Sequence, residues 1–211
     1  MCQTFKSVFK MKENPSTEEQ ILVAAFNVFV EKGFENTKMQ DIAHQAGINR
    51  TVLNYYFRTK ELLYQKIAKT IIRQALPNML KILNSDLPFE QKIEDFVENY
   101  IDLAVKNPFM PLFIINELNN LGSDFIEKLL DGLKPDLNNF IEHVTHEMEL
   151  GKIVKINPIQ VPLHIISLCA FPVLGKPMVK LIINADEKQY NQIIQERKTE
   201  IVRFVLKGLK P

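Results

Sequence analysis

A short segment between residues 47 and 60 carries side chains suited to binding nucleic acid. It contains Arg50, Arg58 and Lys60 and no acidic residue, which gives it a formal charge of +3. Residues 61–211 carry 18 basic and 19 acidic residues, and the whole chain has a net charge of only +1. Because arginine donates to base edges and lysine binds phosphate oxygens, this local patch is the part of the chain that indicates DNA binding.

Two helices are expected to precede this patch. Ser16 and Glu19 can form a capping box that starts the first helix, and Gly33 ends it. A second box, from Thr37 to Gln40, starts a helix of barely two turns, which is too short to be stable alone. The core positions expected in these two helices are Leu22, Ala25, Phe26, Phe29, Met39, Ile42, Ala43 and Ala46.

A third short helix should carry the patch itself. Gly47 supplies the turn before it, Asn49 is its N-cap, and Thr59 caps a fourth helix that runs to about Pro77. The helical period turns Val52, Leu53 and Tyr56 inward. It leaves Arg50, Thr51, Asn54 and Tyr55 facing outward. Two short helices joined by a glycine turn, the second rich in hydrogen-bond donors, are the pattern of a helix-turn-helix.

Four stretches of this region resemble the TetR family of bacterial regulators. They are residues 33–37 (GFENT), 41–43 (DIA), 46–48 (AGI) and 53–62 (LNYYFRTKEL), in that order. The resemblance covers roughly residues 17–65. The remaining two thirds of the chain are similar to the family only in being a helical bundle of suitable length.

The resemblance implies which residues contact DNA. Thr37 and Lys60, at the starts of the second and fourth helices, would contact phosphates, and Arg50 and Thr51 would read bases in the major groove. Asn54 departs from the family, which commonly has tyrosine there, so its contact is left open. The full set expected to contact DNA is Thr37, Lys38, Asn49, Arg50, Thr51, Asn54, Tyr55, Tyr56 and Lys60.

The rest of the chain shows helical periodicity throughout. Amphipathic segments predict helices at roughly 89–106, 109–120, 124–149, 158–171 and 188–208. The fold class is therefore expected to be all-α. A three-helix helix-turn-helix DNA-binding domain at 14–60 would precede a helical-bundle domain for effector binding and dimerisation at 61–211.

Specific binding by a helix-turn-helix calls for two copies about one turn of duplex apart, ~34 Å. The resemblance places the dimer interface in the last two long helices, although core packing within one protomer would account for about half of the candidates equally well. The interface candidates are Leu163, Ile166, Ala170, Ile193, Ile194, Ile201, Phe204 and Val205.

Soft, bulky side chains suggest an apolar ligand pocket, and here too core packing is an equal explanation. The pocket candidates are Phe109, Met110, Phe113, Phe125, Met148, Cys169 and Phe171.

Other chemistry is weakly indicated. The chain has no glycine-rich phosphate loop, nucleophile elbow or metalloprotease motif, so no catalytic residue and no cofactor are expected. His143 and His146 share a helical face, but surface histidines are far commoner than metal ligands, and no metal is expected. Cys2 and Cys169 suggest no disulfide framework, and no apolar stretch is long enough to span a bilayer, so a cytoplasmic protein without membrane contact is expected.

Taken with the resemblance, these features predict a ligand-responsive repressor. It would bind a palindromic operator in double-stranded DNA as a homodimer and be released by a small, apolar effector. The alternative is a helical ligand-binding or adaptor protein with a vestigial DNA-binding domain, for which Asn54 is the hint.

Overall fold

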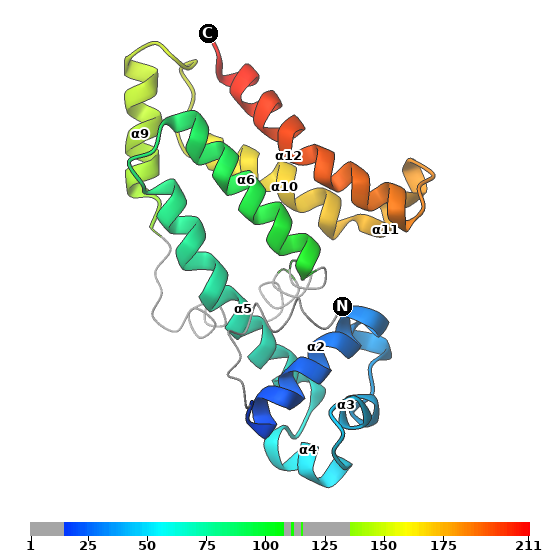
Figure 1. Ribbon diagram of the computed structural model, residues 1–211. Helices are drawn as coiled ribbons and strands as arrows, with labels where there is room; N and C mark the ends of the chain where they lie inside the picture. The colour runs from blue at the N-terminus through cyan, green and yellow to red at the C-terminus, as the bar shows by residue number, and fades with distance from the viewer. Residues whose placement is uncertain (1–14, 108–110, 112–114, 116–135) are drawn as a thin grey trace. The chain divides into compact units, whose positions relative to one another are not determined.

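The structure is a computed structural model that describes residues 15–107, 111, 115 and 136–211. All regular elements in these residues are helices, and no strand occurs among them (Figure 1), which confirms the all-α prediction. The helices are α2 Thr17–Asn36, α3 Met39–Gln45, α4 Arg50–Tyr56, α5 Lys60–Leu83, α6 Phe89–Lys106, α9 Asn138–Glu149, α10 Gln160–Leu174, α11 Lys176–Ile182 and α12 Glu187–Leu209.

The chain divides into two compact units, and the division falls inside α5, between Ala75 and Leu76. The first unit contains α2, α3, α4 and the N-terminal part of α5. Its core is aliphatic where α2 and α3 pack together, and an aromatic cluster joins α2 to α5. In that cluster the Phe29 and Tyr64 rings lie 4.9 Å apart, edge to face, and the Phe34 and Tyr64 rings lie 4.6 Å apart.

Local helix signals in this unit are mostly as predicted. The Ser16 hydroxyl accepts from the Glu19 amide while the Glu19 carboxylate accepts from the Ser16 amide, which confirms the first capping box. Gly33 has φ 76° and ψ 165°, so it breaks the helical path before the last turn of α2. Seven of the eight expected core positions are buried, and Ala46 is half-buried.

The prediction of a second capping box, from Thr37 to Gln40, was wrong. Thr37 lies in the interior, and its hydroxyl donates to the Gly33 carbonyl at 2.6 Å rather than capping α3. The carboxylate of Asp41 instead accepts from the Lys38 amide at 3.0 Å, so α3 begins one residue later than expected. The cause is the conformation of Gly33, which presents a carbonyl to Thr37 that the sequence pattern does not reveal.

The second unit is a bundle in which α6, α10 and α12 pack against one another and α9 closes one side (Figure 1). Its helix α6 coincides with the predicted segment at 89–106. Phe140 of α9 is fully buried and stacks on Phe89 of α6 with 6.1 Å between ring centroids. Apolar side chains from all four helices, including Ile93, Ile165 and Ile201, complete the core.

Proline positions account for the differences from the expected helices. α5 continues through Pro77 to Leu83, and α10 continues through Pro172 to Leu174. The short helix α11 was not predicted, because the stretch from Pro172 to Pro177 was interpreted as a break. The helix expected at 109–120 lies outside the described residues except for positions 111 and 115, which are helical, and the part of the 124–149 helix before residue 136 lies outside them too.

Among the described residues, no single helix is long and apolar enough to cross a membrane. Helices α10 and α11 reach the length and apolar composition of a membrane span only when they are taken together, and they are bent by 78° at their junction.

The backbone at Gly33 provides a test of how this unit is built. Its φ and ψ lie in a region that is essentially restricted to glycine. We expect Gly33→Ala to lower the free energy of unfolding by roughly 1–3 kcal/mol, measured by urea unfolding followed by circular dichroism. Glu35→Ala, at an exposed position in the same turn, is the matched control and should change stability little. Equal stability of the two variants would contradict the role given to Gly33.

Candidate nucleic-acid interface

The turn between α3 and α4 is fixed by a small set of hydrogen bonds. Gly47 adopts φ 67°, which only glycine tolerates at low cost, and the Ile48 amide donates to the Ala43 carbonyl at 3.0 Å. The Asn49 side chain then accepts from the Val52 amide at 2.8 Å, which confirms Asn49 as the N-cap of α4. Leu53 is fully buried and anchors α4 to the unit. The sequence therefore fixes the direction in which α4 presents its outer face.

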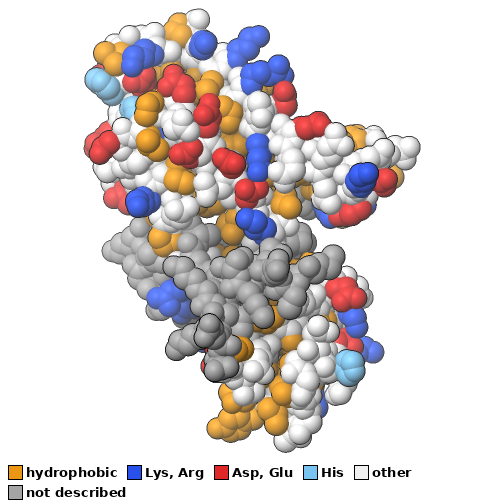
Figure 2. Space-filling model, in the orientation of Figure 1, with side chains coloured by type: hydrophobic (Ala, Val, Ile, Leu, Met, Phe, Trp, Pro, Cys, Tyr) orange, Lys and Arg blue, Asp and Glu red, His pale blue; other side chains and the backbone are white. Residues whose placement is uncertain are grey.

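The outer face of α4 is polar and aromatic. Thr51 and Asn54 are exposed, Arg50 is half-buried, and Tyr55 is 85% exposed. Tyr56 was predicted to face inward, but it is 42% exposed and its ring meets that of Tyr55 edge to face at 5.4 Å. The error arises because α4 has only two turns, so a single buried residue, Leu53, is enough to hold it. On the face drawn in Figure 2, hydrophobic side chains gather at the end of this unit where α4 lies.

Lys60 is held by the end of α2. Its ammonium donates to the Phe34 carbonyl at 2.9 Å and to the Glu35 carbonyl at 3.3 Å, and it lies 4.3 Å from the centre of the Phe34 ring. A helix C-terminus carries partial negative charge on its carbonyls, so a lysine there is electrostatically favoured. Phe34 and Lys60 lie 26 positions apart, so the sequence offered no local signal for this contact.

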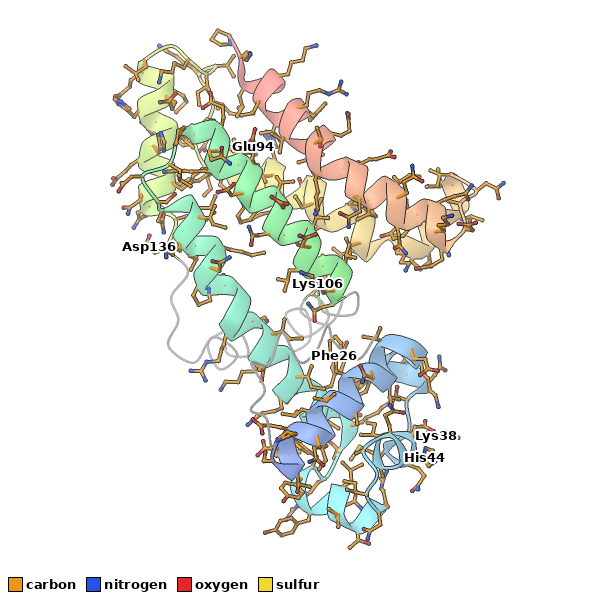
Figure 3. All side chains as sticks on the ribbon, viewed as in Figure 1. Phe26, Lys38, His44, Glu94, Lys106 and Asp136 are labelled. Atoms are coloured by element: carbon orange, nitrogen blue, oxygen red, sulfur yellow. The ribbon has the colours of Figure 1, made fainter. Side chains whose placement is uncertain are left out.

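Lys38 extends from the start of α3 into solvent, on the same outer side as His44 (Figure 3). The neighbouring Asp41 pairs with Lys32 at 3.2 Å. The hydrogen bond from the Lys38 amide, reinforced by Lys32, holds the pKa of Asp41 below its usual range. Asp41 is therefore ionised near neutral pH and engaged with Lys32, and the ammonium of Lys38 remains exposed to an incoming anion.

The expected DNA-contacting residues lie in the turn before α3 (Thr37 and Lys38), on α4 with its N-cap Asn49, and at the start of α5 (Lys60). Three of their side chains already form hydrogen bonds within the unit: Thr37 with Gly33, Asn49 with Val52, and Lys60 with Phe34 and Glu35. Thr59 accepts from the Leu62 amide at 3.3 Å, which confirms its role as a cap.

The expected effector residues are divided. Phe109, Met110, Phe113 and Phe125 lie outside the described residues. Cys169 is buried in the core of the second unit, where Met148 packs partly buried, whereas Phe171 is 55% exposed. Burial raises the pKa of the Cys169 thiol to about 12.

The expected interface residues are divided too. Leu163, Ile166 and Phe204 are exposed, and Ala170 and Ile193 are half-buried. Ile194, Ile201 and Val205 belong to the protomer core.

His143, considered above as a metal ligand, forms a different contact. Its Nδ1 lies 2.8 Å from the Nζ of Lys92, a lysine that is 3% exposed. A charged lysine only donates, so Nδ1 accepts and the proton of the neutral ring is on Nε2, which lies 3.8 Å from Glu147. Glu147 also pairs with Lys152 at 3.0 Å. Burial, and then the charge of Lys92, lower the pKa of His143. Among the described residues no cluster of three or more potential metal ligands is found.

Comparison with known proteins tests the helix-turn-helix assignment. A sequence model of "Bacterial regulatory proteins, tetR family" matches residues 21–67, which run from the first turns of α2 into α5. This match, and the regulators that align over most of the chain, support a regulator of the TetR family. The matched region is the helix-turn-helix, and RutR, which aligns over 92% of the chain, is an HTH-type transcriptional regulator. The match covers the elements that carry the candidate interface, including both glycine turns.

Individual relatives match nearly the whole length of the chain. The regulator RutR of Escherichia coli K12 is 24% identical over 197 residues, which are 92% of this chain and 91% of RutR. The fatty acid degradation regulator FadR of Bacillus halodurans superposes with a TM-score of 0.62 at 18% identity, covering 92% of this chain and 97% of FadR. FadR of Bacillus subtilis, solved in complex with stearoyl-CoA, gives 0.61 at 18% identity, covering 90% and 98%. The two solved structures show the shared fold.

Lys60 offers a test that separates structure from DNA contact. Lys60→Met keeps the length of the side chain but removes the donors to Phe34 and Glu35. In the absence of DNA, we expect this substitution to lower the free energy of unfolding by about 1 kcal/mol, because the hydrogen bonds that it removes are partly solvated. Arg58→Met, at an exposed neighbouring position, should leave stability unchanged. Urea unfolding of both variants checks this, and an unchanged stability of Lys60→Met would show that the contact with α2 contributes nothing.

The Lys92–His143 contact predicts a pH dependence. Because the pKa of His143 is lowered in the folded state, the unfolded chain binds more protons as pH falls through about 6.5. Stability should therefore decline between about pH 7 and 5.5, with a slope from this group of at most about 1.4 kcal/mol per pH unit. His143→Gln keeps an acceptor for Lys92 and should flatten the decline. The exposed His44→Gln is the control, and an unchanged slope in His143→Gln would contradict the assignment.

Proposed function

We propose that the protein is a homodimeric repressor that binds a palindromic operator through α4 and releases it when an apolar effector binds. The observation that carries the proposal is the outer face of α4, where Thr51, Asn54 and Tyr55 are exposed around a firmly capped helix. Side chains of these types, presented on a helix that follows a tight turn, fit the major groove.

The proposal gives each side chain a role. Arg50, Thr51 and Asn54 read base edges. Tyr55, Tyr56 and Asn49 approach the DNA backbone on either side of the major groove. Lys38 and Lys60 bind phosphates, and Lys60 exchanges the carbonyls of α2 for a phosphate as it does so. Thr37, whose hydroxyl donates a hydrogen bond to the Gly33 carbonyl, holds the neighbouring Lys38 in position.

Dimerisation is proposed through α10 and α12. Leu163, Ile166 and Phe204 expose apolar surface on these helices. Ser167, Ala170 and Gly208 are small residues on the same helices and permit close approach of a second copy. Two recognition helices related by a two-fold axis would then meet half-sites about one duplex turn, ~34 Å, apart.

Effector response is proposed for residues 61–211, and DNA binding for residues 14–60. α5 contributes to both compact units, so a change in its tilt in one unit is transmitted to the other. Two solved structures support an apolar effector: FadR of Bacillus halodurans is a fatty acid degradation regulator, and FadR of Bacillus subtilis was solved with stearoyl-CoA. A ligand that binds best to the tilted state shifts the population away from DNA.

DNA binding tests the proposal directly. We expect the protein to bind the DNA upstream of its own gene and to lose roughly 10³ to 10⁵ in affinity between about 50 and 200 mM salt. Arg50→Ala should weaken binding by about 10- to 100-fold, measured by fluorescence anisotropy. Lys188→Ala, an exposed cation of α12 in the second unit, is the control for loss of one charge.

The same assay separates the alternatives. Absence of specific binding to any DNA by the unmodified protein would favour a ligand-binding or adaptor protein with a vestigial helix-turn-helix. Stearoyl-CoA is the first effector probe, and it should raise the dissociation constant of the complex. Tighter binding in its presence would contradict release by effector.

A further inference from the structure

The short helix α11 presents an apolar tip to solvent. Leu181 is 81% exposed, Ile182 is 71% exposed and Met178 is 46% exposed. No residue of α11 is buried. Single exposed apolar side chains are common on protein surfaces, but three on one short helix form a contiguous patch of the kind that marks an interaction site.

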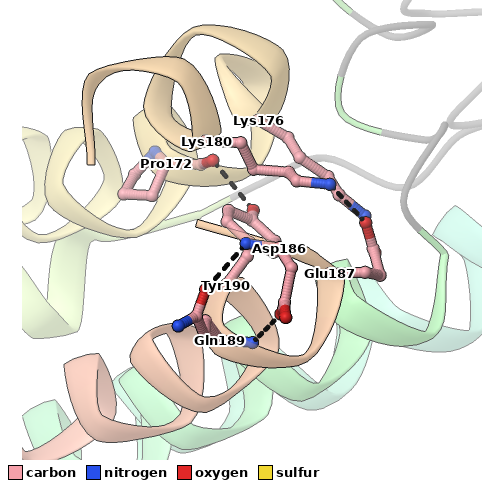
Figure 4. A network of polar contacts seen from close by, with 7 residues as sticks. All are labelled: Pro172, Lys176, Lys180, Asp186, Glu187, Gln189 and Tyr190. Atoms are coloured by element: carbon pink, nitrogen blue, oxygen red, sulfur yellow. Dashed lines mark hydrogen bonds and ion pairs between the residues drawn. The ribbon is translucent and has the colours of Figure 1, made fainter. Parts of the chain in front are cut away.

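A network of polar contacts holds this apolar tip in a fixed position (Figure 4). The Tyr190 hydroxyl donates to the Pro172 carbonyl at 2.9 Å, and Lys176 and Lys180 both pair with Glu187, the latter at 3.0 Å. Hydrogen bonds from Lys176 and then Lys180 hold the pKa of Glu187 below its usual range. The two ammonium groups therefore turn toward α12, and the outward side of α11 is left apolar. A patch held rigid in this way loses little conformational freedom on docking.

A complementary apolar groove lies at the opposite end of the same helices. It has a volume of about 290 Å³ and is lined by the first half of α10, the last turns of α12 and the preceding loop, including Ile156, Leu168, Phe204 and Gly208. The N-terminal half of α10 and the C-terminal end of α12 lie at the groove, and the other ends of both helices lie next to α11 in the chain. At the groove, the Val154 amide donates to the Leu209 carbonyl. Since α10 has 15 residues, groove and tip are separated by ~20 Å along its axis and do not meet within one protomer.

We propose that the tip of α11 docks in the α10–α12 groove of a second copy of this chain. This inference rests on the proposed dimer. Consider a two-fold axis that lies in the interface, perpendicular to α10 and α12 and near their middle. Such an axis places the α11 end of these helices in one protomer against the groove end of the same helices in the partner. It brings Leu181 and Ile182 of each protomer to the groove of its partner. An axis parallel to the helices would instead place tip against tip and leave both grooves open to water.

The area of the interface supports this arrangement. A specific interface buries about 800 Å² on each partner. The exposed apolar side chains of α10 and α12, namely Leu163, Ile166, Phe171 and Phe204, expose on the order of 100 Å² each and provide only about half of that area. α11 follows α10 after Gly175, and its exposed Met178, Leu181 and Ile182 add an area of similar size, so the two together reach the size of a stable interface.

Disulfide trapping between two differently tagged full-length variants tests the proposal. Both carry Cys2→Ser, and one adds Leu181→Cys while the other adds Gly208→Cys. A Cβ at Gly208 would meet no atom within 4 Å, so this change fits the groove. We expect a mixed disulfide between the two variants and little self-linking of either. Glu94→Cys, exposed on α6 and outside α10, α11 and α12, replaces Leu181→Cys as the control and should give no link to Gly208→Cys.

Other outcomes would overturn the proposal in distinguishable ways. Strong self-linking of Leu181→Cys would show that α11 meets α11, and a dimer with no disulfide would place α11 outside the interface. Both results leave the proposed DNA-binding dimer intact. A monomer by light scattering would overturn the docking and the dimer together, and the anisotropy assay then reports DNA binding separately.

Charge substitution provides a second measurement. Leu181→Asp should raise the dimer dissociation constant by at least about tenfold, as expected for an anchor side chain that fills an apolar groove, with helical content unchanged because Leu181 is exposed in the protomer. Asn191→Asp makes the same change in charge at an exposed position of α12 and should have little effect. An unchanged dissociation constant in Leu181→Asp would overturn the proposal.

Discussion

The reversal of the chain at Gly33 determines how the first unit is assembled. Its backbone conformation turns the carbonyls at the end of α2 toward two later residues. The Thr37 hydroxyl donates to the Gly33 carbonyl, and the Lys60 ammonium donates to the carbonyls of Phe34 and Glu35. The Phe34 ring then lies against Tyr64 of α5. One glycine therefore fixes the start of α3 and the start of α5 relative to α2, and α4 is carried between them.

Features that depend on neighbours in the sequence were predictable. The caps at Ser16, Asn49 and Thr59 were anticipated because each involves a side chain and an amide three positions away. α6 was placed correctly because its buried residues, from Phe89 to Ala104, recur with a clear helical period. The family resemblance rested on the same short-range features, and it extended as far as the matched region does.

Features that depend on tertiary contacts were not predictable in the same way. The sequence favoured Thr37 as a cap because nothing local reveals that Gly33 offers it a carbonyl. It placed Tyr56 inside because a helix of two turns has too few positions to define a buried face. In α12, Ile201 and Phe204 are equally apolar and three positions apart, yet one is in the core and the other is on the surface. Only the packing of α6 and α10 distinguishes them.

The burial of Cys169 makes this thiol a native reporter of motion in the second unit. Since the thiolate is the reactive form, a thiol with a pKa of about 12 inside the core of α6, α10 and α12 is protected from alkylating reagents while the bundle is closed. Labelling then requires a transient opening of the bundle, as hydrogen exchange of a core amide does. The rate of Cys169 modification thus follows the opening free energy of the bundle, and a ligand that tightens the bundle slows that rate without any introduced probe.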